Sequence, residues 1–536
     1  MCAFAAFGGI FFGYDTGWMG GVMGMNYFIR QYTGLEYPDT SSDGLIGTDA
    51  YKTAFVLPGW QQLLLTGILS CGTFFGAIIA GDLADHIGRR WTIISGCVVF
   101  IVGCILKVAS TGLALLVVGR FIAGAGVGFV SAVIILYMSE IAPKKVRGAL
   151  VSGYQFCITI GILFANCVVY ATQSRDDTGS YRIPIAVQFL WAIILAAGLF
   201  LLPESPRYFV KKGKIDQAAK ALANVRGQPL ESEYIQDELP EIIANHEYEL
   251  SVTPPPPLRA DTGLRGATAS PEVSATRLPT SVARSSVSVS RPCSSLPGID
   301  FLFYYGTVFF TQLGSISNPF LISLITTLVN VCSTPISFYI VEKFGRRNML
   351  IVGGTGMVIA QYITGTIGVT AGKVHADGTF NSSATSAMIA FTCINIFFFP
   401  TSWGPFCWVV IGEVFPLPIR LRGVGLSTSS NWFWNCIIAV ITPYLVDTQY
   451  ANLSSKIFFM WGSLCIVSVL FVYFLVPETK GLSLEQVDRM MEEVNPQNSR
   501  KWVPHSTFAA DMRLKVRGQE SSIEHVTAPA EAKEAV

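Results

Sequence analysis

The sequence predicts an all-α membrane protein with twelve transmembrane helices in two six-helix halves. Three observations predict this fold class. Of the 536 residues, 51% are hydrophobic and only 14% are charged, whereas a soluble protein has about 25% charged residues. The apolar residues gather in twelve runs separated by polar stretches. In addition, three short charged patterns occur once in each half of the chain, as duplication of a six-helix unit would produce.

The twelve apolar runs are the predicted spans, because an α-helix needs roughly 20 apolar residues to cross a bilayer. The seventh run is short, and its 16 residues extend about 24 Å as a helix, less than the hydrocarbon core of about 30 Å. The predicted spans are 3–25, 55–81, 91–108, 112–138, 149–172, 183–203, 298–313, 318–341, 348–371, 386–412, 423–446 and 457–476.

Basic residues give the expected orientation, because Lys and Arg are enriched in cytoplasmic connections. The connections after the second, fourth, eighth and tenth spans are basic, whereas those after the first, third, seventh, ninth and eleventh contain few Lys or Arg residues. We therefore expect the even-numbered connections and both termini in the cytoplasm. The basic residues concerned are Arg89, Arg90, Lys144, Lys145, Arg147, Arg346, Arg347, Arg420 and Arg422.

Two glycosylation sequons fall outside the membrane in this topology. Asn381 lies in a long outer connection and is the candidate for glycosylation, whereas the loop that contains Asn452 is too short to favour it. Apolar sequence begins at residue 2 without a basic segment before it, so we expect no cleavable signal peptide.

The duplicated patterns lie at the cytoplasmic ends of spans and recur with offsets of 257, 273 and 274 residues. They are "GDLADHIGRR" (81–90) with "VEKFGRR" (341–347), Glu140-x6-Arg147 with Glu413-x6-Arg420, and "PESPR" (203–207) with "PETKG" (477–481).

These patterns predict a cytoplasmic charge latch. Acidic and basic groups at helix ends bridge neighbouring helices, and a motion that breaks the bridges gives two states. The alternative is a topology signal together with solvated loop charges. The predicted latch residues are Asp85, Arg89, Arg90, Glu140, Arg147, Glu204, Arg207, Glu342, Arg346, Arg347, Glu413, Arg420 and Glu478.

Taken together, several motifs resemble those of the sugar-porter family of the major facilitator superfamily, and the chain looks most like the hexose transporters of filamentous fungi. The resemblance covers 8–250 and 298–495 and rests on "GYDTG", "GDLADHIGRR", "GRFIAGAGVG", "YMSEIAPKKVRG", "PESPRY", "VEKFGRR", "EVFPLPIRLRG" and "PETKGLSLE". It implies the major facilitator fold with a cytoplasmic helical linker domain. This family usually has a polar leader before its first span, so we expect the start of the chain to be trimmed.

The expected domains follow from the spans and the resemblance. They are an N-terminal half (1–203), a cytoplasmic helical linker (204–250), a Pro/Ser/Arg-rich disordered segment (251–297), a C-terminal half (298–477) and a cytoplasmic tail (478–536).

Asp15 lies near the middle of the first span, where a carboxylate costs about 2.5–3.5 kcal/mol and needs a partner or a purpose. Arg120 in the fourth span is the expected partner. If the two separate during transport, protonation of Asp15 follows conformation, as in the proton symporters of the resembled family. A fixed buried ion pair is the alternative, since yeast facilitators of that family keep the aspartate.

A sugar site needs side-chain amides, which donate and accept hydrogen bonds, and an aromatic wall for the apolar ring face. The resemblance implies amides at Gln155, Asn330, Asn431 and Asn435, an aromatic wall at Trp408 and Phe399, and a helix break at Gly404–Pro405. For the single asparagines the alternative is contact between helices. Tyr304 and Tyr305 are candidate gates, with plain packing as the alternative. Asp300 is a further candidate ligand.

The seventh span lacks the family's Gln-Gln-x-x-Gly-x-Asn motif, whose positions are taken here by Ser294, Ser295, Gly298 and Asp300. Codons that encode Cys-Ser-Ser-Leu-Pro (293–297) can be chosen so that the same bases, read in a frame that starts one base earlier, encode Met-Gln-Gln-Leu-Thr. We therefore hypothesise that roughly 255–297 is translated out of frame. The alternative is a real disordered insertion, whose "PPPPLR" (254–259) fits an SH3 ligand.

The sequence thus predicts transport of a monosaccharide, a hexose such as glucose, by alternating access coupled to protons at the plasma membrane. Three alternatives stay open: facilitated diffusion, a non-transporting sugar sensor, and a chain inactivated by its damaged seventh span. We expect no enzymatic activity, metal or cofactor. The expected partners are the sugar, a proton and membrane lipid, without nucleic acid or an obligate protein.

Overall fold

The computed structural model describes residues 2–36, 57–143, 146–252, 298–312, 319–371, 381–415, 420–446, 451, 453–482 and 484–503. Within these residues the regular structure is helical and contains no strand. Several predicted features lie outside the described residues: Lys144, Lys145, Asn452, Ser294 and Ser295, and nearly all of the segment 251–297.

The N-terminal half is a bundle in which α7 packs against both α5 and α6, and α2 packs against α8. A Cβ atom on Gly13 of α2 would overlap the carbonyl of Ile158 in α8, so glycine lets these two backbones touch. The helices are α1 (Cys2–Ala6), α2 (Gly8–Val22), α3 (Asn26–Thr33), α5 (Gly59–Ile87), α6 (Arg89–Ala109), α7 (Leu113–Ile141), α8 (Arg147–Thr172) and α9 (Gly179–Leu199).

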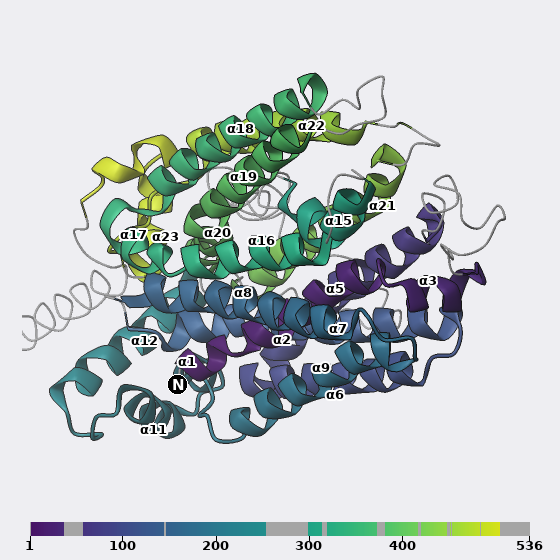
Figure 1. Cartoon of the computed structure of the whole chain (residues 1–536). Helices are drawn as coiled ribbons and strands as arrows, with labels where there is room; N and C mark the ends of the chain where they lie inside the picture. Colours follow the sequence, from purple (N-terminus) through teal and green to yellow (C-terminus); the bar gives the residue numbers. More distant parts are fainter. Residues whose placement is uncertain are drawn as a thin grey trace, which may run out of the picture.

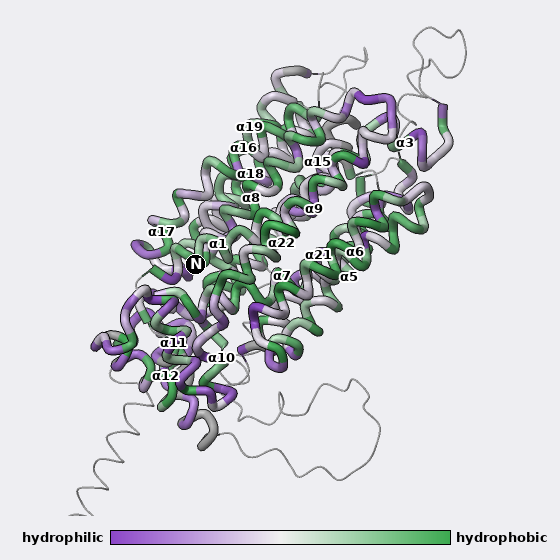
Figure 2. Tube along the Cα trace, turned by 90° about the horizontal axis from the view of Figure 1, so that it is seen from below, coloured by the Kyte–Doolittle hydropathy of each residue, from purple (hydrophilic) through white to green (hydrophobic). Residues whose placement is uncertain are grey.

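Three helices connect the halves: α10 (Pro206–Lys211), α11 (Ile215–Arg226) and α12 (Glu233–Val252). They cover most of the predicted linker (204–250), and α12 ends two residues beyond it. Figure 2 shows many hydrophilic residues on them, at one end of a bundle whose long helices are mostly hydrophobic.

The C-terminal half contains two interrupted helices. The axes of α16 and α17 differ by 43° near Pro335, which cannot continue the helical hydrogen bonds. A π-helical turn, η4 (Phe399–Trp403), joins α19 to α20. The elements of this half are α15 (Ile299–Gln312), α16 (Pro319–Ser333), α17 (Ile336–Phe344), α18 (Arg346–Thr370), α19 (Ser382–Phe398), α20 (Gly404–Val414), α21 (Arg420–Val446), η6 (Ser454–Lys456) and α22 (Ile457–Leu475), and the tail adds α23 (Leu484–Glu493) and η7 (Pro496–Lys501).

Each predicted span overlaps one of these helices or a broken pair of them. Among the described residues, eight helical segments are long and apolar enough to cross a membrane, and α16 with α17 makes a ninth if the bent pair counts as one span. The bundle also exposes many large apolar side chains outward, for example Val98, Ile193 and Val352, as a lipid-facing surface requires. The total of twelve stays a prediction.

The two halves lie side by side, with the purple and blue helices of the first beneath the green helices of the second (Figure 1). They meet where α5 packs against α21, α8 against α16 and α20, and α2 against α15. These contacts bring residues from both halves to a common centre.

Candidate functional site

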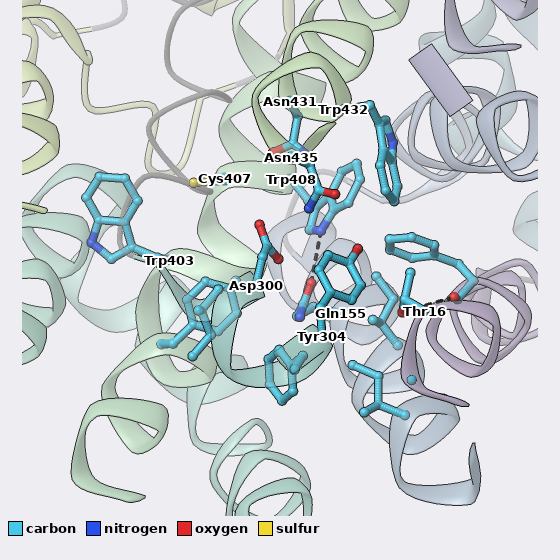
Figure 3. Close-up of a pocket in the computed structure, with 18 residues that line it drawn as sticks. Thr16, Gln155, Asp300, Tyr304, Trp403, Cys407, Trp408, Asn431, Trp432 and Asn435 are labelled. Carbon is cyan, nitrogen blue, oxygen red and sulfur yellow. Dashed lines mark hydrogen bonds between the residues drawn. The ribbon is translucent and has the colours of Figure 1, made fainter. Parts of the chain in front are cut away.

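A pocket lies between the halves and is lined by residues of α2, α8, α15, η4, α20 and α21 (Figure 3). Its lining combines amide, hydroxyl and carboxylate groups with aromatic rings. Predicted residues that line it are Gln155, Asp300, Tyr304, Phe399, Gly404, Trp408, Asn431 and Asn435.

Gln155 and Trp408 form the contact between α8 and α20 inside this pocket. The indole Nε1 of Trp408 donates a hydrogen bond of 3.0 Å to Oε1 of Gln155, and both side chains are buried. The edge of Tyr154 meets the Trp408 ring at 90°, with centroids 5.3 Å apart. A Cβ atom on Gly404 would lie 3.2 Å from the Gln155 amide, so this glycine leaves room for Gln155.

The helix interruption before Trp408 differs from the predicted break at Gly404–Pro405. The chain widens into the π-helical turn at Phe399–Trp403 and then continues helically through both residues. Pro405 has no N–H for the preceding turn, which accounts for the irregularity on its N-terminal side. Such turns occur frequently at functional sites, and this one places Phe399 in the pocket wall.

The asparagines of α21, Asn431 and Asn435, line the pocket beside Trp408 (Figure 3). Oδ1 of Asn435 accepts a hydrogen bond of 2.7 Å from the hydroxyl of Ser70 in α5. This bond joins the two halves beside the pocket, while Asp300 brings a carboxylate to it from α15.

Three predicted residues do not line the pocket. Asn330 is buried in α16, and its Oδ1 accepts no hydrogen bond within the described residues. Pro405 is buried but does not line the pocket. The Tyr305 hydroxyl hydrogen-bonds to Thr66 of α5 at 2.6 Å and donates to the carbonyl of Ala439 in α21 at 2.8 Å. Tyr305 therefore links the halves instead of facing the cavity.

Sequence reasoning missed part of the aromatic lining. Phe12 and Trp432 meet edge to face, with centroids 5.4 Å apart and planes at 78°, and both line the pocket with Thr16. Trp432 directly follows Asn431, a predicted site residue, so its position in the sequence could have indicated that it lies near the pocket. Trp403 also lines the pocket, but its indole N–H donates a hydrogen bond to the Leu350 carbonyl of α18 at 2.8 Å.

A buried ion pair adjoins the pocket on α2. Nζ of Lys107 in α6 lies 3.1 Å from Oδ1 of Asp15, and neither side chain is exposed. Gln188 of α9 accepts hydrogen bonds from Lys107 at 2.6 Å and from Cys104 at 3.2 Å. The indole of Trp18 donates to Asp15 at 3.4 Å. Within the described residues, Oδ2 of Asp15 has no hydrogen-bond partner.

This geometry corrects the predicted partner of Asp15, which is Lys107 and not Arg120. Arg120 is also buried, but its Cζ lies 5.2 Å from the ring centroid of Trp18. Lys107 Nζ lies 5.7 Å from the same centroid, so two cations flank one indole ring. The cation paired with the Asp15 carboxylate is therefore Lys107 of α6.

At the charged end of the N-terminal half, Arg89 joins three helix ends. Its guanidinium contacts Glu140 at 3.0 and 3.2 Å, and the Ser205 hydroxyl also donates to Glu140. The carboxylate of Glu204 accepts the backbone N–H groups of Arg89 at 3.0 Å and Arg90 at 3.1 Å. Burial raises the pKa of the Glu204 carboxyl, and these N–H donors oppose that effect.

The C-terminal half repeats this cluster residue by residue. Arg346 contacts Glu413 at 3.1 Å, and the Thr479 hydroxyl donates to Glu413 at 2.7 Å. Glu478 accepts the backbone N–H groups of Arg346 at 2.8 Å and Arg347 at 3.2 Å. The duplicated sequence patterns therefore correspond to duplicated three-dimensional clusters, each within one half.

Contacts between the halves also occur at this end. Glu342 of α17 accepts the N–H of Ala149 in α8 at 3.3 Å, and Arg422 lies 3.1 Å from Asp82 across the interface of α21 and α5. The other predicted latch residues lie at the same end. Asp85 pairs with Lys211 at 2.8 Å, and Nε of Arg420 donates a hydrogen bond to the Phe415 carbonyl at 2.9 Å. Arg147 is the first residue of α8, and Arg207 lies in α10.

Asn381 caps the N-terminus of α19, where its Oδ1 accepts the N–H of Ala384 at 3.2 Å. The cap uses the carbonyl oxygen, so the amide nitrogen is the atom left for a glycan.

Comparisons with known proteins match nearly the whole chain. The profile of the family described as "Sugar (and other) transporter" matches residues 1–491. The major facilitator-type transporter ecdD of Aspergillus rugulosus is 41% identical over 99% of this chain and 94% of its own length. The probable glucose transporter rco-3 of Neurospora crassa is 39% identical over 94% of this chain and 81% of its own length.

Among solved structures, the chain is similar to the major facilitator superfamily proton:xylose symporter XylE of E. coli bound to 6-bromo-6-deoxy-D-glucose. The TM-score is 0.71 at 23% identity, over 91% of this chain and 98% of that one. The arrangement of helices is thus that of the major facilitator fold.

Proposed function

Because the chain belongs to the sugar (and other) transporter family, we propose that it carries a monosaccharide, a hexose such as glucose, across the plasma membrane by alternating access coupled to protons. The family and the fold class agree with those predicted from the sequence. The observation that carries the proposal is the pocket between the halves, which combines amides with aromatic rings.

In this proposal the pocket lining recognises both surfaces of a sugar. Gln155, Asn431 and Asn435 offer amide donors and acceptors to hydroxyl groups, and Asp300 accepts hydrogen bonds from them. Trp408 receives the apolar CH face of the ring. Because the indole N–H of Trp408 already holds Gln155, that amide keeps a fixed orientation toward the substrate.

Alternating access follows from contacts between halves on both sides of the pocket. At the charged end, Glu342 and Arg422 reach across the interface. Toward the other end, the Tyr305 hydroxyl joins α15 to α5 and α21, which is the arrangement of a gate. Rocking of one half against the other would open one set of contacts at a time.

Proton coupling in this proposal resides on α2. Asp15 faces Lys107 inside the N-terminal half, while the next residue, Thr16, lines the pocket. A movement of α2 that accompanies sugar binding would therefore change the surroundings of Asp15. Arg120 is the second cation available to its carboxylate.

The proposed orientation places the charged clusters, α10–α12 and both termini in the cytoplasm, and Asn381 outside. The segment 251–297 keeps its interpretation as out-of-frame sequence between the linker and the C-terminal half. Transcript sequence across 255–297 tests that hypothesis: a frame that encodes Met-Gln-Gln-Leu-Thr before Gly298 is expected, and a continuous frame encoding the residues as printed would refute it.

Uptake of labelled glucose by a transporter-null host tests the function. We expect saturable uptake that falls when Gln155 is replaced by Ala, with unchanged uptake when Gln173 at the end of α8 is replaced in the same way. A proton ionophore then tests coupling. Uptake that continues without accumulation in its presence would identify a facilitator, and no uptake at all would favour a sensor or an inactive chain.

A further inference from the structure

A second pocket, of about 300 Å³, lies at the charged end of the C-terminal half. It is formed where α17 ends, where the chain leaves α22, and by η7 and the residues after it. Its lining residues include three cations and an indole: Lys343, Lys480, Arg500 and Trp502.

The three cations of this pocket have no carboxylate partner within the described residues. Nζ of Lys343 donates to the Tyr339 hydroxyl at 2.8 Å, and Nζ of Lys480 donates to the Lys343 carbonyl at 2.9 Å. Arg500 is exposed. The one acidic lining residue, Glu478, already accepts three backbone N–H groups. With three cations and one carboxylate in its lining, the pocket carries a net positive charge.

The duplicated counterpart in the N-terminal half has different side-chain contacts. There the position of Lys343 is taken by His86, whose carbonyl accepts the Tyr208 hydroxyl at 3.1 Å. One nearby cation, Lys211, is paired with Asp85 at 2.8 Å. The same backbone pattern thus holds a tyrosine and a neutral ion pair in one half, and an open, basic pocket in the other.

Exposed apolar side chains surround this pocket on the side of the bundle surface. Tyr339 is 65% exposed, Phe344 53%, Tyr473 52% and Phe474 51%. Aromatic residues of this kind gather at the membrane–water interface. In the proposed orientation the pocket therefore lies at the level of the cytoplasmic lipid headgroups, which include anionic lipids.

We propose that this pocket binds a phosphate group, supplied by the headgroup of an anionic phospholipid. The Arg500 guanidinium offers paired N–H donors for phosphate oxygens, and the two ammonium groups add point charges. Asn348 and Trp502 complete the lining. The site depends on the proposed function only for its orientation in the membrane, and its binding is measurable without transport.

Thermal unfolding of the purified full chain in neutral detergent tests the site. Titrated short-chain phosphatidic acid is expected to raise the melting temperature, and phosphatidylcholine is not. Replacing the three cations together (Lys343→Ala, Lys480→Ala, Arg500→Ala) is expected to weaken the apparent affinity about 100-fold, at about fivefold per cation. The matched control removes three exposed lysines of the linker: Lys212→Ala, Lys214→Ala and Lys220→Ala.

Inorganic phosphate and glycerol 3-phosphate distinguish the source of the phosphate group. If they raise the melting temperature of the native chain at millimolar concentration and lose this effect in the triple variant, the ligand is a soluble phosphate. If the triple variant unfolds, the single Arg500→Ala variant replaces it in the comparison. Its expected loss of apparent affinity is smaller, about fivefold. Equal responses of the native chain, the triple variant and the Arg500 variant to phosphatidic acid, or no response of the native chain to any phosphate compound, would overturn the proposal.

Discussion

Replacing Lys107 by Met should destabilise the protein far more than its position near the end of a span indicates. The perturbation removes the cation 3.1 Å from Asp15 and leaves a carboxylate with no exposure to solvent. At that distance the attraction is about 5 kcal/mol at an effective dielectric constant of about 20. Breaking one side of a buried pair typically costs about 3–5 kcal/mol. We therefore expect Lys107→Met to lower the free energy of unfolding by about 3–5 kcal/mol.

A double variant separates charge from packing. Asp15→Asn combined with Lys107→Met removes both charges, and we expect it to recover most of the lost stability, since replacing a whole buried pair is often neutral. The control is Arg175→Met, which breaks a shorter ion pair, 2.8 Å from Asp177, whose partners are 49% and 54% exposed. Exposed pairs contribute about 0–1 kcal/mol.

Melting temperatures of the purified variants, measured by intrinsic fluorescence, provide the comparison. The expected order of stability is native and Arg175→Met highest, the double variant close below, and Lys107→Met alone lowest. A double variant as unstable as Lys107→Met would show that lost packing, and not an uncompensated charge, causes the effect. A Lys107→Met protein as stable as the native one would show that the pair contributes no stability.

Three further predictions concern other parts of the molecule. Trp408→Phe keeps a ring but removes the donor to Gln155; a lost hydrogen bond of about 1 kcal/mol should raise the KM for glucose uptake about fivefold, and an unchanged KM would remove this bond from substrate recognition. Arg346→Gln, at a side chain 3% exposed, should destabilise by about 3–5 kcal/mol, whereas Arg422→Gln, at one 46% exposed, should change stability by less than about 1 kcal/mol; equal melting temperatures would contradict this. Asn381→Gln should abolish an endoglycosidase-sensitive shift on gels of the membrane-expressed protein, and a shift that persists would place the glycan elsewhere.

The helices were predictable because their signals are local. Apolar length and flanking charge set where a span begins and ends, so the predicted span 149–172 is observed as Arg147–Thr172 and 457–476 as Ile457–Leu475. The interruptions were less accessible. Pro335 marks the bend between α16 and α17, but the π-helical turn before Gly404 depends on how the backbone relaxes around Pro405.

The pocket was predictable only where a motif specified a residue. Gln155 and Trp408, which the resemblance named, both line the pocket, whereas Asn330 is buried away from the cavity and Trp432 lines it unexpectedly. Which side of a helix faces the pocket depends on the rotation of that helix about its axis. Packing against neighbouring helices sets this rotation, and the composition of a single span does not encode it.

Lys107 shows why the ion pair was assigned to the wrong partner, and what the correct one implies. A lysine near the end of a span normally extends toward the membrane interface. Here the ammonium group of Lys107 instead donates a hydrogen bond to the amide oxygen of Gln188 inside the bundle. Successive residues on a helix point about 100° apart. Asp15 therefore faces this cation while Thr16 faces the pocket between the halves. A rotation of α2 that adjusts Thr16 to a substrate must also move Asp15 relative to Lys107, so one helix links the two sites without any intermediate element.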